Sequence, residues 1–190
     1  MVVIAKLKEE RYLIDVGYGS DVPLQPVKLA HNFQFSQFGA KQGKIEYRSI
    51  DQHVDPSQKL WIYLMQDGKD AAWEEQYCFF DHEFIPEDFE LLNLAPMSDP
   101  KSYFVNNVMG ALAVQDGNVP TGMYTLFNGT VKKTDAEGTK VVMKFETEEE
   151  RVKMFEDIFG IVLTDEEAAT IRGRVTELDK AKSWDTMDKV

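Results

Sequence analysis

The sequence has a single cysteine, Cys78, and no apolar run that approaches the roughly 18 residues needed for a membrane-spanning helix. One cysteine excludes an internal disulfide framework and is typical of the reducing cytoplasm, where we expect the protein to reside. The first residues also lack the pattern of a secretory signal, because charged side chains at positions 6 and 8–11 interrupt the only early apolar run.

Basic side chains are scarce as well: 21 lysines and arginines stand against 33 aspartates and glutamates, which gives a formal net charge of −12. A field of this sign repels nucleic acid and anionic membrane surfaces, so neither is expected as a partner. It also opposes a phosphate-bearing ligand at long range. Such a ligand therefore needs a local site of basic side chains or backbone amides.

The three histidines show no spacing typical of a zinc site, so no metal is expected. His31 and His53 are predicted to have solvated or structural roles. His82 shares a predicted strand face with Cys78, but residues four apart along a strand lie about 13 Å from each other, too far for direct proton transfer. A lone cysteine between two aromatic residues is more often part of the core, and we expect that role for Cys78.

With 43% hydrophobic residues, the composition is that of a globular chain. In the first part of the sequence, short runs of β-type residues alternate with turns. The predicted strands cover residues 2–5, 12–16, 46–50, 60–64 and 76–80, and the predicted turns include Asp67-Gly68 and Gln42-Gly43. Short strands at this spacing predict a small antiparallel barrel or sandwich.

The pattern changes after residue 84, where apolar residues recur at helical spacing. Asp99 followed by Pro100 predicts the N-cap and first turn of a second helix. Two further strands are predicted at residues 123–127 and 141–145, with a turn between them. The first half of the chain is therefore expected to be all β, and the second half mixed.

The C-terminal part predicts two capped helices. Residues 147–150 and 164–167 both read as capping boxes, in which a threonine and a glutamate satisfy backbone amides of the first turn. Gly160 is expected to end the first of these helices, since a glycine readily adopts the left-handed conformation found there.

Three motifs resemble, in the same order, those of the arylamine N-acetyltransferase family. Residues 12–19, Tyr-Leu-Ile-Asp-Val-Gly-Tyr-Gly, are similar to the family's strand ending in Asp-Val-Gly-Phe-Gly. Residues 88–93 and 98–104, Asp-Phe-Glu-Leu-Leu-Asn and Ser-Asp-Pro-Lys-Ser-Tyr-Phe, resemble an interdomain helix and a Thr-Ser-Pro-x-Ser-x-Phe turn. Residues 155–163 resemble the family's Leu-x-x-x-Phe-Gly-Ile-x-Leu ending. Each motif alone is weak, and the ordered set is fairly specific.

The resemblance implies an α+β fold with two of the family's three domains, within the cysteine-protease-like superfamily. Residues 1–83 are expected to form an antiparallel β-barrel domain that holds the triad aspartate. Residues 84–110 are expected to form an interdomain helical segment. Residues 111–190 are expected to form an α/β lid domain with a C-terminal helix.

In that family a Cys-His-Asp triad transfers acetyl from acetyl-CoA to an arylamine or hydrazine, a reaction of xenobiotic metabolism. The histidine lowers the pKa of the thiol, and the aspartate fixes the tautomer of the imidazole. The resemblance assigns the aspartate to Asp15. Considered alone, an aspartate before a glycine is more often a turn residue that accepts backbone hydrogen bonds.

The same resemblance places Gly17, Tyr18 and Gly19 along the cleft for CoA and the acceptor. Ser98 stands where the family has a threonine that contacts the phosphate region of the cofactor. Asp99, which follows it, would repel a phosphate, although Lys101 could offset that charge. A capping role for Ser98 is the alternative, and both roles are compatible.

The sequence contains no counterpart of the family's Arg-Gly-Gly-x-Cys motif, and aligning Asp15 places the family's histidine immediately before Met1. We therefore expect this polypeptide to be inactive by itself. The alternative is a noncatalytic module that binds acyl-CoA or a protein partner, or one half of an enzyme completed by a separate N-terminal piece. Without the family's N-terminal domain, apolar surface around Val3, Ile14 and Val16 should be exposed and favour self-association.

Overall fold

The computed structural model describes residues 1–178 of the chain. Contacts between Cα atoms divide it into two compact units, each discontinuous in sequence. The first comprises residues 1–89, 113–123 and 134–138, and the second comprises residues 90–112, 124–133 and the chain from residue 139 onward. The domain boundaries expected from the sequence stay a prediction.

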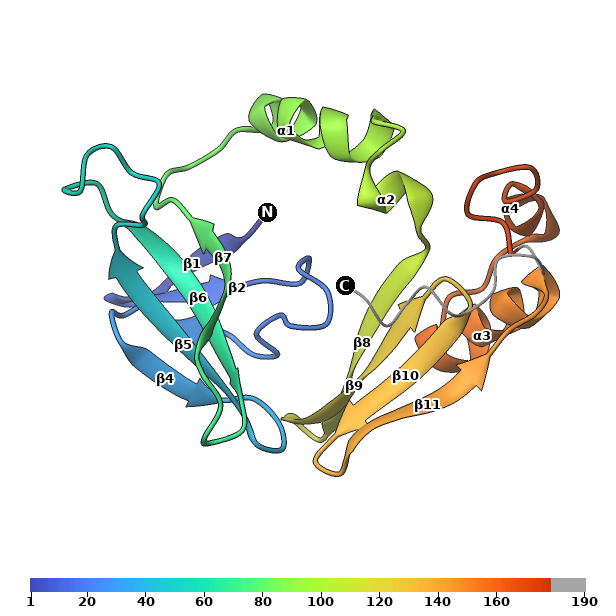
Figure 1. Cartoon of the computed structure of the whole chain (residues 1–190), viewed down its shortest axis with the longest axis horizontal. Helices are drawn as coiled ribbons and strands as arrows, with labels where there is room; N and C mark the ends of the chain where they lie inside the picture. The colour runs from blue at the N-terminus through green and yellow to red at the C-terminus, as the bar shows by residue number, and fades with distance from the viewer. Residues whose placement is uncertain (179–190) are drawn as a thin grey trace. The chain divides into compact units, whose positions relative to one another are not determined.

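The first sheet is a short antiparallel one formed by β1 (Val3–Leu7), β2 (Glu10–Ile14) and β3 (Val27–Lys28) (Figure 1). Val3 pairs with Ile14 at one end of the β1–β2 hairpin. At the other end Lys8 turns the chain with a φ of 57°, in the left-handed region. The hairpin confirms the two strands expected at the start of the sequence.

The second sheet is antiparallel in the order β4 (Phe33–Ser36), β5 (Lys41–Arg48), β6 (Leu60–Asp67) and β7 (Glu74–Phe79). The central strand β6 is covered on both faces. Trp61, Tyr63 and Met65 face the main core, whereas the alternate residues of the strand form a second small apolar cluster. This strand therefore reads as a continuous apolar run rather than as an alternating one.

The two sheets share that main core. Leu13 from β2 and Val27 from β3 pack in the same cluster as Ile45, Tyr63 and Phe79 from the second sheet. The expected α+β fold with an antiparallel N-terminal part is thus observed, with its strands hydrogen-bonded as two sheets.

The turn expected at Gln42-Gly43 is wrong, because both residues lie inside β5. Gly43 pairs with Phe35 on one side and with Met65 on the other. A Cβ atom on Gly43 would overlap the ring of Phe35. The glycine is therefore required by the close approach of an aromatic ring and not by a turn.

The second half of the chain begins with α1 (Pro86–Ser98) and α2 (Tyr103–Asn106). A four-stranded sheet follows, formed by β8 (Met109–Asp116), β9 (Val119–Phe127), β10 (Thr130–Asp135) and β11 (Gly138–Lys144). Helices α3 (Glu148–Phe159) and α4 (Asp165–Ala169) complete the described chain. Met154 from α3 packs with Leu126, Val131 and Phe145 in the core of this part.

The helix ends follow the sequence patterns with one exception. Thr147 and Thr164 both form the expected capping boxes, and Gly160 ends α3 with a φ of 68°. Asp99, however, does not cap a helix; α2 is capped by Ser102, whose hydroxyl accepts a hydrogen bond from the amide of Phe104. The carboxylate of Asp99 instead accepts from the amide of Lys101, which closes a local turn.

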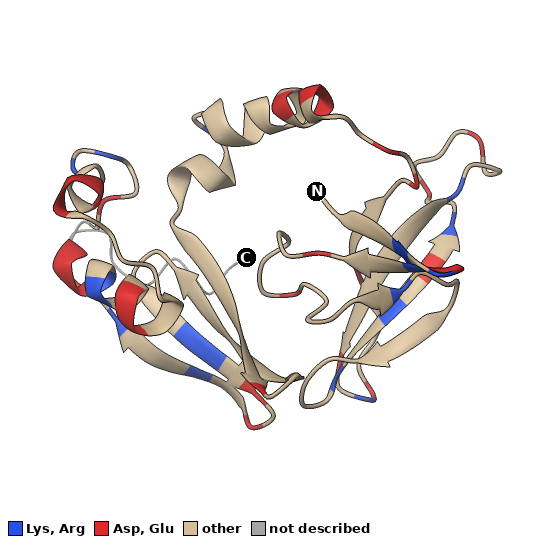
Figure 2. Cartoon of the chain, turned by 180° about the vertical axis from the view of Figure 1, so that it is seen from behind, with Lys and Arg blue, Asp and Glu red and all other residues tan. Residues whose placement is uncertain are grey.

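Negative charge gathers at the beginnings of the helices. Acidic residues occupy the first turns of α1, α3 and α4, as the red segments of Figure 2 show. Carboxylates at these positions are stabilised by the partial positive charge of the helix N-terminus. Part of the net charge of −12 therefore has a local structural role.

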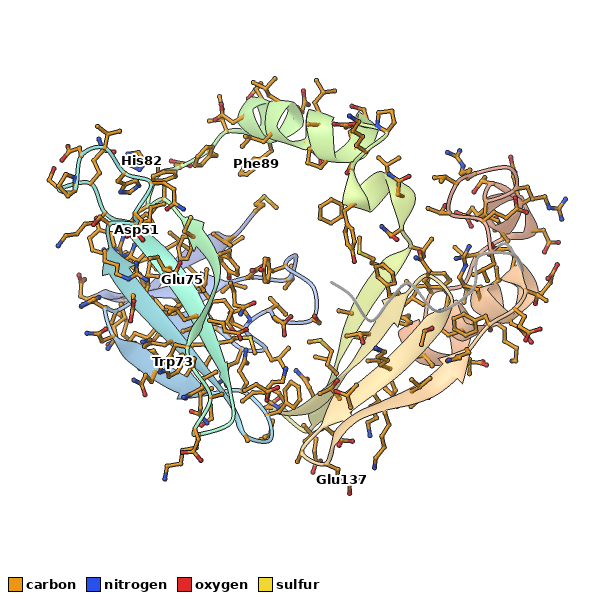
Figure 3. The ribbon with its side chains drawn as sticks, in the orientation of Figure 1. Asp51, Trp73, Glu75, His82, Phe89 and Glu137 are labelled. Atoms are coloured by element: carbon orange, nitrogen blue, oxygen red, sulfur yellow. The ribbon has the colours of Figure 1, made fainter. Side chains whose placement is uncertain are left out.

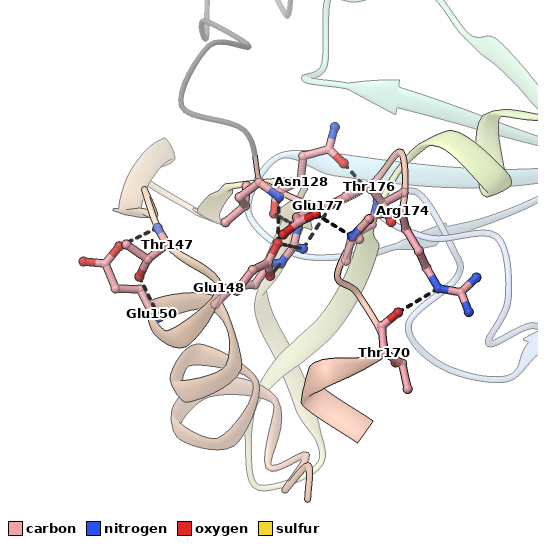
Figure 4. A network of polar contacts seen from close by, with 12 residues as sticks. Asn128, Thr147, Glu148, Glu150, Thr170, Arg174, Thr176 and Glu177 are labelled. Carbon is pink, nitrogen blue, oxygen red and sulfur yellow. Dashed lines mark hydrogen bonds and ion pairs between the residues drawn. The ribbon is translucent and has the colours of Figure 1, made fainter. Parts of the chain in front are cut away.

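A buried arginine holds the residues after α4 against α3 (Figure 4). Arg151 is 2% exposed and forms an ion pair with Glu148, with Nη2 and Oε1 2.6 Å apart. The guanidinium also donates to the carbonyl of Thr176, and the same Glu148 oxygen accepts from the amide of Leu178. Each charge of the pair thus has further hydrogen-bond partners, as a buried ion pair requires.

Two of the three apolar residues expected at the surface are exposed. Val3 is 52% and Val16 is 94% exposed, whereas Ile14 is half-buried. No helix within residues 1–178 has the length and apolar character to cross a membrane.

Replacing Gly43 by alanine is expected to cost about 1–3 kcal/mol, because the ring of Phe35 must leave its place in a packed core. Chemical denaturation measures this cost. In the background of Phe35→Leu the same change should cost clearly less, since the ring is gone. Equal costs in the two backgrounds would show that Phe35 is not the obstacle.

Replacing Glu148 by glutamine is expected to destabilise the chain by about 3–5 kcal/mol, because the buried Arg151 loses its counter-charge. Denaturation in urea measures the effect. Glu149→Gln is the matched control, since Glu149 lies beside it in the exposed first turn of α3. A similar loss in both variants would contradict the role given to the ion pair.

Candidate active site

Asp15 follows the last residue of β2 and is 6% exposed. Leu13, two residues earlier, is fully buried, so the alternation of the strand directs both side chains inward. One carboxylate oxygen, Oδ1, accepts a hydrogen bond of 2.8 Å from the amide of Gly17. Asp15 therefore has the turn role considered above, and this hydrogen bond holds its carboxylate in the interior.

Three tyrosines surround the carboxylate. Tyr63 from β6 and Tyr77 from β7 are paired across the sheet, with ring centroids 5.3 Å apart. Tyr18, from the loop after Asp15, packs its ring 4.7 Å from that of Tyr77. The hydroxyl of Tyr18 donates to the carbonyl of Gln76 at 2.6 Å, which fixes this loop residue against β7.

The environment of these tyrosines favours their protonated forms. Burial raises the pKa of Tyr77 far above its ordinary value, and the neighbouring Asp15 carboxylate raises it further. Burial likewise raises the pKa of Tyr63 and that of Tyr18, with the negative charges of Asp21 and then Asp15 adding to both, while the hydrogen bond with Gln37 lowers the pKa of Tyr63. All three side chains are therefore neutral at physiological pH; Tyr18 donates its proton to Gln76, and the hydroxyls of Tyr63 and Tyr77 retain theirs for another acceptor.

The hydroxyl of Tyr77 is buried and has no hydrogen bond of ordinary geometry among the described residues. The Asp15 carboxylate lies close enough to affect its pKa without completing such a bond. A buried hydroxyl left unpaired costs free energy, so a small shift of either side chain that forms this hydrogen bond would be favourable. The pair is arranged so that Tyr77 can donate to the carboxylate.

Gly17 and Gly19 leave the backbone near Asp15 open. A Cβ atom on Gly17 would lie 3.8 Å from the Asp15 carboxylate and 3.9 Å from the carbonyl oxygen of Met1. Gly19 has a φ of 96°, which side-chain-bearing residues rarely adopt, and space is open at its Cβ position. A ligand can therefore approach the main chain closely here.

Ser98 is the last residue of α1 and belongs to the second contact unit. Its hydroxyl donates to the carbonyl of Leu94, one turn earlier in the same helix. The oxygen of Ser98 can still accept a hydrogen bond, but its proton is used within the helix. Of the site residues expected from the sequence, the structure brings together Asp15, Gly17 and Tyr18.

The expectation of a core role for Cys78 is wrong. Cys78 is exposed on β7, because the neighbours Tyr77 and Phe79 take the two inward positions of the strand. His82 follows the end of β7 (Figure 3) and is exposed, with its ring 6.5 Å from that of Phe80 in an edge-on arrangement.

The Nδ1 atoms of the other two histidines lie within hydrogen-bond distance of backbone atoms. The Nδ1 atom of His31 accepts a hydrogen bond from the amide of Tyr47, and that of His53 lies 3.0 Å from the carbonyl oxygen of Gln58. Within residues 1–178, no group of histidine, cysteine and acidic side chains is arranged to hold a metal ion.

Sequence reasoning missed Tyr63 and Tyr77 as neighbours of Asp15, and the buried Gln37 as a hydrogen-bond partner of Tyr63. Both tyrosines lie in strands that were predicted, so their inward direction could be inferred from alternation. What the sequence did not indicate is the pairing of β6 with β7, since that register joins residues 14 positions apart.

Comparison with known proteins identifies relatives of most of the chain. A family model described as N-acetyltransferase matches residues 1–168. The N-malonyltransferase FDB2 of Gibberella moniliformis is 35% identical over 177 residues, which cover 88% of this chain and 51% of that protein. Its counterpart in Fusarium pseudograminearum is 33% identical with similar coverage. The chain thus spans about half the length of the curated relatives it matches.

Solved structures show the same fold. An arylamine N-acetyltransferase of Mycobacterium smegmatis superposes with a TM-score of 0.72 at 21% identity, over 93% of this chain and 59% of that one. The enzyme of Salmonella typhimurium gives a TM-score of 0.70 at 18% identity, over 90% of this chain and 59% of that one. With the family model matched over most of its residues, the chain belongs to the arylamine N-acetyltransferase family.

Proposed function

We propose that this chain provides the aspartate-bearing part of an acyl-CoA-dependent N-acyltransferase that acts on arylamines or hydrazines. The observation that carries the proposal is the position of Asp15. It is a buried carboxylate directly after β2, fixed by the amide of Gly17 and bordered by tyrosines. A carboxylate held in this way can orient an imidazole and stabilise its protonated form.

The residues around Asp15 have separable roles in this proposal. The hydrogen bond from Gly17 fixes one oxygen and thereby the plane of the carboxylate. Tyr63 and Tyr77 exclude water from one side, which strengthens electrostatic interactions at the site. Gly17, Tyr18 and Gly19 border the space that acyl-CoA and the acceptor amine would enter.

The cysteine and histidine of the reaction have no counterpart at the expected positions within residues 1–190. The carbonyl of Met1 lies near Gly17, and β1 pairs with β2 up to Val3 and Ile14. A residue joined to Met1 would therefore lie beside the turn that holds Asp15. By itself this polypeptide is expected to bind its ligand without turnover.

The acyl donor is either acetyl-CoA or malonyl-CoA. The relatives named N-malonyltransferase favour malonyl-CoA, because they are more similar in sequence than the solved acetyltransferases. A structure of the Mycobacterium marinum arylamine N-acetyltransferase was solved in complex with CoA, which supports a CoA thioester in either case.

Asp15→Asn is expected to lower turnover by a factor on the order of 10⁴, because the amide favours the wrong imidazole tautomer. The assay uses this chain extended upstream by a segment with Arg-Gly-Gly-x-Cys and the histidine, supplied with an arylamine and either donor. Asp21→Asn is the matched control; it removes a nearby charge that is paired with Lys41. Turnover that survives in Asp15→Asn would show that the aspartate is wrongly assigned.

Gly17→Ala is expected to weaken binding of CoA by about tenfold or more, since a methyl group would stand where the ligand meets the backbone. Calorimetry on the present chain measures this affinity. The melting temperature should stay unchanged, because no atom within 3.8 Å opposes the new methyl group. Absence of heat with the unchanged chain at millimolar CoA would remove both the ligand assignment and the alternative of a noncatalytic acyl-CoA-binding module.

A further inference from the structure

Gln37 is a polar side chain placed in the interior, between β4 and β5. It is 8% exposed, although glutamine is usually found at the surface. Its Nε2 atom donates to the carbonyl of Val22 at 3.0 Å and to the hydroxyl of Tyr63 at 2.9 Å. Its Oε1 atom accepts from the amide of Leu24 at 3.0 Å. Both amide protons and the amide oxygen of this side chain are therefore used.

Two of these bonds go to backbone groups on either side of Pro23. Val22 and Leu24 flank Pro23, which has no amide proton, in the loop that connects β2 to β3. One glutamine satisfies the carbonyl before the proline and the amide after it. Because buried backbone groups must be paired, this single side chain sets the path of the loop at that point.

The third bond connects the loop to the surroundings of Asp15. The hydroxyl of Tyr63 accepts from Gln37, and the ring of Tyr63 packs against that of Tyr77. Tyr77 in turn packs against Tyr18, which belongs to the same loop. The loop is therefore held at two places, by the hydrogen bonds from Gln37 and by the packing of Tyr18 on Tyr77. Tyr63 contacts both Gln37 and Tyr77 and so connects the two places.

We propose that Gln37 is a positioning residue, which holds the loop of residues 16–26 and thereby the backbone at Gly17–Gly19 in the conformation that receives the ligand. The part of this inference that concerns acyl-CoA rests on the proposed function. The part that concerns the loop stands on the three hydrogen bonds and on the burial of the amide.

Amide hydrogen exchange, measured by NMR at single residues of the present chain, tests the loop directly. Gln37→Met keeps the length of the side chain and removes all three bonds. Loss of one buried hydrogen bond corresponds to about a tenfold change in an equilibrium constant. The amide of Leu24 is therefore expected to exchange about tenfold faster in this variant, whereas the amides of β5 and β6 change little.

Gln37→Glu distinguishes the hydrogen bond that Gln37 accepts from those that it donates. The carboxylate keeps an acceptor for Leu24 and can also accept a proton from the Tyr63 hydroxyl, whereas the donation to the Val22 carbonyl is lost, so the Leu24 amide should remain protected. Gln25→Met is the matched control, because Gln25 lies in the same loop with its side chain at the surface and loses only one long hydrogen bond, 3.4 Å from Nε2 to the carbonyl of Ser36. Amide exchange in Gln25→Met is expected to match that of the unchanged chain.

The binding of CoA, measured by calorimetry, is expected to weaken in Gln37→Met and to be unchanged in Gln25→Met. Uniformly faster exchange at all amides in Gln37→Met would overturn the proposal, since it would show only a loss of global stability. Equal exchange rates of the Leu24 amide in Gln37→Met and Gln37→Glu would also overturn the proposal. If the unchanged chain binds no CoA, the proposed function fails, whereas the exchange at Leu24 still decides whether Gln37 holds the loop.

Discussion

A negative charge in an apolar interior is the constraint that organises the first contact unit. The carboxylate of Asp15 is almost fully buried, and its direct hydrogen bond comes from the backbone two residues later. Such a group is stable only where neighbouring dipoles replace water. The hydroxyl of Tyr77 on β7, kept protonated by burial and by the neighbouring carboxylate, is placed to supply such a dipole. The loop that follows must then be held in place, and Gln37 satisfies its backbone.

The second contact unit also contains a buried side chain that is charged, here a positive one. Arg151 is buried and paired with Glu148 one turn earlier, and both side chains bind backbone groups beyond α4. In each unit a buried ionised side chain fixes a segment without regular structure. Segments of this kind gain their order from specific polar contacts, since they bury little apolar surface of their own.

The chain belongs to the arylamine N-acetyltransferase family, and the acyl transfer that we propose for it assigns the buried carboxylate of Asp15 one role in that reaction. The chain spans about half the length of its curated relatives, and in the proposed function the cysteine and the histidine come from outside the matched part. The identity of the acyl group depends on how the site accommodates a second carboxylate. Malonyl carries that charge, and the net charge of −12 opposes it at long range.

The sequence by itself determined the local features: the first hairpin, the capping boxes at Thr147 and Thr164, and the motif around Asp15. These depend on residues within a few positions of one another, which is the range over which propensity and capping act. The sequence patterns misassigned Gly43, Asp99 and Cys78. The roles of Gly43, which lies against the ring of Phe35, and of Cys78, which is exposed on β7, depend on how the strands pack. The helix cap lies at Ser102, three residues after Asp99. Only the tertiary structure decided that Tyr63 and Tyr77 lie near the aspartate and that Gln37 binds Tyr63. Strand register and the packing of two sheets on one core bring these residues together, and no local pattern encodes either.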